Sequence, residues 1–176
     1  MSFTDPTRNL AQFGLSESAR VADFGAGSGA YTLAAAKLVG TSGRVYAIDV
    51  EKIFLTRIKN LARESGLSNV EVVWGDVEKL GGTKLRDQSL DAVIASNLLF
   101  QVEDRDGLLG EILRVLKPRG RALIVDWSDS FGNMGPRPQE VVRESAARTL
   151  FERSGFILER EIDAGEHHYG LVMRKA

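Results

Sequence analysis

Three aspartates in the first half of the chain lie within or at the end of an apolar stretch. Glycines follow shortly after the first of them. Asp23 stands inside "VADFGAGSGAY", Asp49 closes "GRVYAIDV" and Asp76 closes "NVEVVWGD". Carboxylates accept hydrogen bonds from hydroxyl, amine and ammonium groups, and a glycine cluster lets the backbone turn sharply or lie against a ligand. Because ligands bind at the carboxyl ends of strands in open α/β sheets, these residues indicate a nucleotide site.

The identity of that nucleotide depends on the charges around the glycines. Gly25, Gly27 and Ala30 satisfy the dinucleotide pattern G-x-G-x-x-G/A, and Asp49 follows where a carboxylate binds ribose hydroxyls. Asp23, however, would repel a pyrophosphate and attract an ammonium group. Asp76 is placed to accept a hydrogen bond from an exocyclic amine such as that of adenine. The residues thus favour a nucleoside with an ammonium group and leave a dinucleotide as the alternative.

The elements that must position these residues alternate along the chain. Helical spacing with glycine or proline at the ends predicts helices between strands, and this alternation is typical of a parallel sheet covered on both faces. Only residues 163–166 separate the last two strands, so those strands must be antiparallel. Residues 77–88 show little apolar periodicity. The predicted strands are 19–24, 43–50, 69–76, 89–96, 120–127, 156–162 and 167–175, and the predicted helices are 29–39, 51–66, 105–118 and 138–155.

Composition and net charge exclude several classes of site and function. The chain has 176 residues, a net charge of −1 and no cysteine, which predicts one domain over residues 1–176 without disulfides, thiolate metal sites or a cysteine nucleophile. No metal is expected, because no ligand spacing supports one. General nucleic-acid binding is disfavoured by the charge. We find neither a signal peptide nor an apolar run of membrane-spanning length, and we expect a cytoplasmic protein.

Six motifs occur in order along the chain: "VADFGAGSGAYTL", "VYAIDV", "VVWGDVEKL", "LDAVIASNLLFQVED", "EILRVLKPRGRALIVDW" and "HHYGLVMRK". Together they resemble the class I S-adenosylmethionine-dependent methyltransferases, and within them the branch that includes the ubiquinone/menaquinone C-methyltransferases. The resemblance implies a three-layer, Rossmann-like α/β fold with seven strands in the order 3-2-1-4-5-7-6, strand 7 antiparallel. It also implies methyl transfer from S-adenosylmethionine to oxygen or carbon of a small-molecule acceptor.

The resemblance carries cofactor roles onto particular positions. It implies that the glycines pack against the methionine part, that Asp49 binds the ribose and that Asp76 faces the adenine. The chain departs from relatives at Phe100-Gln101, where many have a His-Glu pair, and it lacks the cysteines of arsenic methyltransferases and the N/D-P-P-Y/F motif. The full set of expected cofactor-binding residues is Asp23, Gly25, Gly27, Gly29, Asp49, Val50, Asp76, Val77 and Ser96.

Candidate residues for the acceptor lie later in the chain. Since methyl transfer needs mainly alignment, few catalytic groups are required. Asn97 follows the fourth strand, and the antiparallel hairpin places the His167-His168 pair on the ligand side, where at most one ring can face the pocket. We take Asn97 and His168 as catalytic candidates, and Trp127 and Arg137 as acceptor-binding candidates. The histidines could equally be polar residues at a strand start, and Trp127 could pin the 127–138 loop.

Three other functions remain open from the sequence, one of which is a non-catalytic module that binds S-adenosylmethionine. A nicotinamide-dependent oxidoreductase would bind the same glycine loop, although we find no catalytic Tyr/Lys pair. An RNA methyltransferase would need a basic surface or an added recognition domain. The sequence leaves the oligomeric state undetermined.

Overall fold

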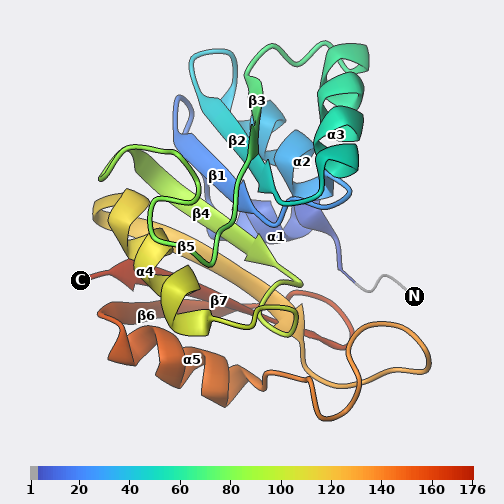
Figure 1. Ribbon diagram of the computed structural model, residues 1–176, viewed down its shortest axis with the longest axis vertical. Coiled ribbons are helices and arrows are strands. Elements are labelled where there is room, and N and C mark those ends of the chain that lie inside the picture. The colour runs from blue at the N-terminus through green and yellow to red at the C-terminus, as the bar shows by residue number, and fades with distance from the viewer. Residues whose placement is uncertain (1–3) are drawn as a thin grey trace.

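The structure is a computed structural model that describes residues 4–176. Its core is one sheet in the order β3-β2-β1-β4-β5-β7-β6 (Figure 1). Strands β1 to β5 run parallel, and β7 runs antiparallel to both β5 and β6. The expected strand order and the reversed last strand are confirmed. The strands are β1 (Arg20–Phe24), β2 (Arg44–Asp49), β3 (Val70–Trp74), β4 (Leu90–Ser96), β5 (Leu116–Trp127), β6 (Phe156–Ile162) and β7 (His168–Lys175).

Helices cover both faces of the sheet (Figure 1). Successive strand residues point to opposite faces, so Val21 and Val45 meet one layer while Ala22 and Tyr46 meet the other. Both sets are buried, which explains why the central strands read as continuous apolar runs. One layer holds α1 (Pro6–Phe13), α2 (Ala30–Val39) and α3 (Lys52–Glu64), and the other holds α4 (Arg105–Val115) and α5 (Glu144–Arg153).

Helix α1 is an element that the sequence prediction missed. The Asp5 side chain caps it by accepting the N–H groups of Thr7 and Arg8, and proline at position 6 starts the helix with a φ that is already helical. Leu10 and Phe13 bury it against α2. The Asp5-Pro6 pair was therefore the available signal. The expectation of no signal peptide also involves residues 1–3, which lie outside the described residues.

The predicted helix over 138–155 is wrong at its start, because α5 begins only at Glu144. Val142 is buried in the core and its carbonyl accepts the Tyr169 hydroxyl at 2.9 Å, which holds an extended backbone before the helix. Arg137 and Glu140 form a separate turn, in which the Glu140 N–H donates to the Arg137 carbonyl. The loop after β5 therefore extends to residue 143.

Residues 75–89, all of which the structure describes, connect β3 to β4 with turns and loop alone. The buried Glu111 of α4 anchors this connection, since its carboxylate accepts the N–H groups of Gly81 and Thr83. Arg114 binds the same carboxylate through Nε at 2.8 Å and Nη2 at 2.7 Å. This tethering explains how a segment without apolar periodicity keeps a fixed path to the sheet edge. Among residues 4–176 no helix has the length and apolar character needed to cross a membrane.

Candidate active site

Two adjoining cavities open at the carboxyl ends of the parallel strands. One has a volume of about 470 Å³ and lies beside the ends of β2 and β3. The other has about 320 Å³ and lies between the ends of β1 and β4 and the start of α2. Gly25, Gly27 and Gln101 line both. Together they form an elongated two-lobed site, a shape that suits a ligand with two chemically different ends.

The glycine loop forms the floor shared by the two lobes. Gly25 and Gly27 have φ values of +67° and +50°, a region that favours glycine. A Cβ on Gly25 would lie 2.8 Å from Leu98 Cδ1, whereas one on Gly27 would meet nothing nearer than 3.9 Å and would enter the cavity. Gly29 instead packs beneath the loop, where a Cβ would lie 2.6 Å from Ile58 Cγ1. Gly27 thus leaves room for a ligand, Gly25 makes room for Leu98, and Gly29 allows α2 and α3 to approach.

Asp49 lies at the end of β2, where the larger lobe meets the loop. Its Oδ2 accepts the Gly27 N–H at 2.9 Å and its Oδ1 accepts the Glu51 N–H at 2.9 Å. Each carboxylate oxygen has a second lone pair, so Asp49 can still accept two hydrogen bonds from a ligand. The carboxylate therefore fixes the glycine loop and faces the cavity at the same time.

Asp76 follows β3 and also lines the larger lobe. Its Oδ1 accepts the Glu78 N–H at 3.0 Å, and its Oδ2 lies 3.2 Å from Lys79 Nζ. Val50 and Val77 provide apolar surface to the same lobe. A flat heterocycle with an amine at its edge fits between apolar side chains and a carboxylate.

Asp23 lines the smaller lobe and is almost fully buried. Burial raises the pKa of its carboxyl to about 7, against the hydrogen bond that Thr32 Oγ1 donates to Oδ2 at 2.7 Å. The nearby Asp49 charge raises the pKa further. A cationic group of a ligand beside Asp23 would lower this pKa again, because it would stabilise the ionised carboxylate.

A polar cluster from the N-terminal segment closes the smaller lobe. Asn9 Nδ2 donates to Thr4 Oγ1 at 2.8 Å and to the Tyr31 hydroxyl oxygen at 2.7 Å. Thr4 and Tyr31 both line the cavity, and the two hydroxyl oxygens lie 3.1 Å apart. Because the Asn9 amide occupies acceptor sites on both hydroxyls, at least one O–H remains available to donate to a ligand. Sequence reasoning missed this cluster because α1 itself was missed.

Asn97 has a strained backbone that three contacts hold in place. Its φ is +51°, its N–H donates to the Val125 carbonyl at 2.7 Å and its carbonyl accepts Gln101 Nε2 at 2.6 Å. Its side chain meets His168, with Oδ1 2.9 Å from Nε2. Asn97 and Ser96 line the smaller lobe, so Asn97 connects that lobe to the start of β7. Residues in such conformations are concentrated at functional sites.

The two histidines have different surroundings. His168 is buried, its Nδ1 lies 3.2 Å from the Glu166 carbonyl oxygen and its ring contacts Trp127 at a centroid distance of 4.3 Å. His167 is partly exposed, bonds Asp129 at 2.8 Å and stacks on Phe131. The structure therefore brings His168 to Asn97 and directs His167 toward the 128–131 segment.

Trp127 and Arg137, the two acceptor-binding candidates, have different surroundings. Trp127 is covered by the loop, since a Cβ on Gly135 would lie 2.6 Å from Trp127 Cε2. Arg137 is exposed, and its backbone N–H donates to Glu140 Oε2. Neither lines the two lobes. The contacts of Trp127 fit the alternative in which it pins the loop.

Asp126 is a buried acid that sequence reasoning did not single out. Its Oδ2 accepts the Leu99 N–H and its Oδ1 accepts the Trp127 N–H, each at 2.8 Å. Burial raises its pKa to about 6, against those hydrogen bonds. It ties the turn that carries Asn97 to the end of β5. Only its position beside Trp127 at the end of a strand could have identified it.

The amino-acid sequence is similar to those of known proteins. Residues 15–165 match the family described as "Methyltransferase domain". The chain is 34% identical over 110 residues to the ubiquinone/menaquinone biosynthesis C-methyltransferase of Vibrio vulnificus, an alignment that covers 62% of this chain and 41% of that protein. It is 32% identical over 116 residues to an arsenite methyltransferase of Aquipseudomonas alcaligenes, covering 64% and 34%. The chain thus spans less than half the length of these relatives.

Solved structures match over nearly the whole chain. A SAM-dependent methyltransferase from Aquifex aeolicus superimposes with a TM-score of 0.89 at 30% identity, covering 99% of this chain and 91% of the other. The [4+2]-cyclase SpnF has a TM-score of 0.81 at 20% identity, covering 96% and 79%. The cyclase shares the fold alone, and its different title shows why function must be argued from the site.

Proposed function

The chain belongs to the methyltransferase domain family, and from that premise we propose that it transfers a methyl group from S-adenosylmethionine to oxygen or carbon of a small-molecule acceptor. One observation carries the cofactor assignment. Asp23 lies near the end of β1, Asp49 ends β2 and Asp76 follows β3, and all three line one two-lobed site whose floor is the glycine loop. The set matches a ligand with an ammonium group, a ribose and an adenine.

The residues fit this cofactor in a definite order along the site. Val50, Val77 and Asp76 would hold the adenine in the larger lobe. Asp49 would accept the two ribose hydroxyls. In the smaller lobe, Asp23 would pair with the ammonium group, and the hydroxyl cluster of Thr4 and Tyr31 would donate to the carboxylate.

When bound, S-adenosylmethionine supplies an electrophilic methyl group on a sulfur that leaves as a neutral thioether. The protein must then align the acceptor, exclude water and receive any proton that the acceptor loses. Gly25, Gly27 and Gln101 mark the junction of the lobes, where the methyl group would emerge. Asn97 lines the smaller lobe beside this junction and is the residue proposed to orient the acceptor.

His168 is proposed to set what Asn97 presents to the acceptor. Both ring nitrogens of His168 lie near oxygens, Glu166 O and Asn97 Oδ1. A ring protonated at Nε2 donates to Asn97 Oδ1 and turns the Asn97 amide nitrogen toward the smaller lobe. A ring protonated only at Nδ1 donates to the Glu166 carbonyl and accepts from the Asn97 amide nitrogen, which turns the amide oxygen toward the smaller lobe. The second tautomer, with an accepting Asn97, suits an acceptor that must lose a proton.

A small organic acceptor is favoured over arsenite. The chain contains no cysteine, and thiolates are the protein ligands that soft elements prefer. The proposal is tested by incubating the protein with methyl-labelled S-adenosylmethionine and a fractionated metabolite extract, and by calorimetry with S-adenosylhomocysteine. Label transfer to a small molecule supports it. Tighter binding of NAD than of S-adenosylhomocysteine would overturn it.

A further inference from the structure

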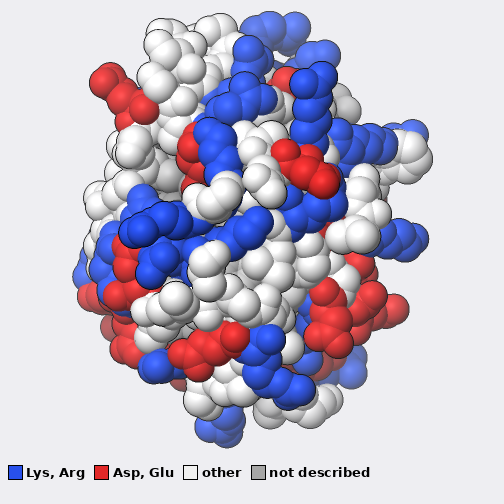
Figure 2. Space-filling model, turned by 90° about the vertical axis from the view of Figure 1, so that its left-hand side faces the viewer, with Lys and Arg blue, Asp and Glu red and all other residues white. Residues whose placement is uncertain are grey.

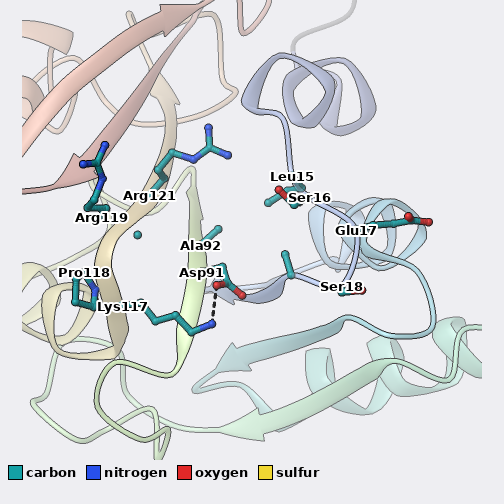
Figure 3. Close-up of a pocket in the computed structure, with 12 residues that line it drawn as sticks. Leu15, Ser16, Glu17, Ser18, Asp91, Ala92, Lys117, Pro118, Arg119 and Arg121 are labelled. Carbon is teal, nitrogen blue, oxygen red and sulfur yellow. Dashed lines mark hydrogen bonds and ion pairs between the residues drawn. The ribbon is translucent and has the colours of Figure 1, made fainter.

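A cavity at the opposite end of the sheet, where the parallel strands begin, does not bring its polar groups together. It has a volume of about 470 Å³, and residues 15–18 and 117–121 form its walls. Arg119 is directed away from the 15–18 wall, and Lys117 pairs with Asp91 at 2.6 Å (Figure 3). On the face that Figure 2 shows, Asp and Glu side chains are interspersed among the Lys and Arg side chains. The polar groups that do converge form a buried cluster beside the smaller lobe of the candidate active site.

The buried cluster consists of Asn9, Thr4 and Tyr31. Asn9 belongs to α1, has an exposed fraction of 0% and lines neither lobe. Its Nδ2 donates to Thr4 Oγ1 at 2.8 Å and to the Tyr31 hydroxyl oxygen at 2.7 Å. Thr4 and Tyr31 both line the smaller lobe. Asn9 is therefore linked to the ligand site through these two hydroxyl groups.

The Asn9 amide has a cost that points to a role. Its Oδ1 is buried and has no hydrogen-bond partner among residues 4–176. Buried polar atoms without a partner are rare in folded proteins, and each one lowers stability. A leucine side chain has the same branching and would carry no unpaired polar atom. The two N–H groups of Asn9, rather than its oxygen, therefore account for an amide at this position.

The cluster leaves one hydroxyl proton for a ligand. The Thr4 and Tyr31 hydroxyl oxygens lie 3.1 Å apart, so one hydroxyl donates to the other. Each oxygen also accepts from Asn9, and a hydroxyl oxygen has two acceptor sites. The receiving hydroxyl thus has both acceptor sites filled and only its own O–H left. Since neither hydroxyl has another hydrogen-bond partner among residues 4–176, that O–H is available to an acceptor atom of a ligand.

We propose that Asn9 is a positioning residue that makes the smaller lobe selective for a ligand with a carboxylate group. The proposal rests on the proposed function, in which the methionine end of the cofactor occupies this lobe. Asn9 does not touch the ligand, and it fills acceptor sites on two hydroxyls so that the remaining O–H donates to the carboxylate. Asp23 in the same lobe pairs with the ammonium group. Without the Asn9 amide, both hydroxyls could equally accept from a ligand, and the lobe would lose its preference for a carboxylate.

The test compares two adenosine thioethers by calorimetry. S-adenosylhomocysteine carries the amino-acid end, and 5′-methylthioadenosine lacks it. In Asn9→Leu we expect affinity for S-adenosylhomocysteine to fall about tenfold, because a charge-assisted hydrogen bond is weakened, and affinity for 5′-methylthioadenosine to stay unchanged. The unfolding midpoint should stay the same or rise, since the unpaired Oδ1 is removed. A purely structural role would lower the midpoint and affect both ligands alike.

Asn69→Leu is the matched control. Asn69 is also buried and lines neither lobe, and its Nδ2 donates to the Ala36 and Gly40 carbonyls at 2.8 and 2.7 Å. The substitution leaves two carbonyl groups without these bonds, so the unfolding midpoint should fall. The ratio of the affinities for the two thioethers should stay that of the parent protein.

The outcomes separate this proposal from the proposed function. Failure of the parent protein to bind S-adenosylhomocysteine would overturn the cofactor assignment and this proposal with it. Binding by the parent, with unchanged S-adenosylhomocysteine affinity in Asn9→Leu or an equal fall for both thioethers, would overturn the role of Asn9 alone. If Asn9→Leu does not fold, Asn9→Asp keeps the side-chain size and should lower the same ratio, because a carboxylate accepts both hydroxyl protons. If neither variant folds, Asn9 serves the fold itself and the proposal is overturned.

Discussion

At the scale of single residues, Asp49 has the clearest expected effect on the cofactor. Asp49→Ala removes both ribose acceptors and the tether to the Gly27 N–H. Charge-assisted hydrogen bonds contribute about 1.5–3 kcal/mol each, so we expect the loss of two to lower cofactor affinity by roughly 10²–10⁴-fold. Calorimetry with S-adenosylhomocysteine measures this loss. Asn97→Ala is the control, and it should keep cofactor affinity and lower turnover. Unchanged affinity in Asp49→Ala would rule out the ribose assignment.

Asp23 should make cofactor binding depend on pH. Its pKa is about 7 in the folded protein and 3.8 in the unfolded reference, so the folded state holds the proton more tightly. This group therefore contributes stability that declines as pH rises from about 4 through about 7. Pairing with the cofactor ammonium favours the ionised form and should release a proton on binding.

We accordingly expect affinity for S-adenosylhomocysteine to rise between about pH 5.5 and 7, below the ordinary pKa of an α-amino group. Calorimetry in two buffers with different ionisation heats measures the released proton. Asp23→Asn, which keeps the side-chain size, should bind more weakly and lose the proton release. The same pH dependence in Asp23→Asn would assign the effect to another group.

Residues that end strands could be predicted from the sequence, and residues brought in by tertiary contacts could not. Asp23, Asp49 and Asp76 each follow a recognisable apolar run, and parallel pairing places their strand ends at one edge. Thr4 and Tyr31 meet only because α1 folds over α2, a long-range contact that no local pattern shows. Gly29 belongs to the glycine motif by spacing, yet it packs against Ile58 of α3 and lines neither lobe.

At the scale of elements, the hydrogen bonds between Glu111 of α4 and the 75–89 connection should contribute strongly to the stability of the folded protein. Hydrogen bonds from Arg114, Thr83 and Gly81 outweigh burial and lower the pKa of Glu111 to about 2. Its contribution is therefore fully present above the unfolded value of 4.5 and lost as pH falls through about 2.

Glu111→Gln should destabilise the protein by about 1–3 kcal/mol at neutral pH, because one carboxylate oxygen becomes an amide nitrogen that cannot accept, and Arg114 keeps only its ion pair with Asp87. Urea denaturation measures the change. Glu152→Gln is the control, since Glu152 forms an exposed helical pair with Arg148 and should lose less than about 1 kcal/mol. Equal effects of the two substitutions would show that the Glu111 network does not anchor the connection.

The elements themselves were largely predictable because buried parallel strands are short apolar runs bounded by glycine or acid. The exceptions have physical causes. Helix α1 is short and its capping pair was overlooked. The start of α5 was placed too early because the Tyr169–Val142 contact holds residues before Glu144 extended, and that contact joins segments 27 residues apart.

At the scale of the whole molecule, cofactor binding should stabilise the sheet as a unit, because the site draws on the ends of four strands. A ligand at a hundred times its Kd adds about 2.7 kcal/mol to stability. For a chain of this size that corresponds to a rise of roughly 5–10 °C in Tm. Thermal melting with S-adenosylhomocysteine should show it, and NAD should give none. A larger shift with NAD would favour the dinucleotide alternative.

The residues in and behind the site come from two separate stretches of the chain. Every described residue that lines the two lobes falls between positions 4 and 102, whereas Asp126 and His168, which contact Leu99 and Asn97 from behind the smaller lobe, lie later in the chain. Helix α4 lies between these stretches. One genetic crossover within α4 would therefore keep both lobes and exchange the residues packed behind Asn97. The Asn97 N–H to Val125 O bond uses backbone atoms and would survive the exchange, whereas the bonds from Asp126 and His168 require the same two side chains in both parents. Recombination between relatives that share these two side chains would thus keep the lobes proposed to hold the methyl donor and replace the surroundings of the residue proposed to orient the acceptor.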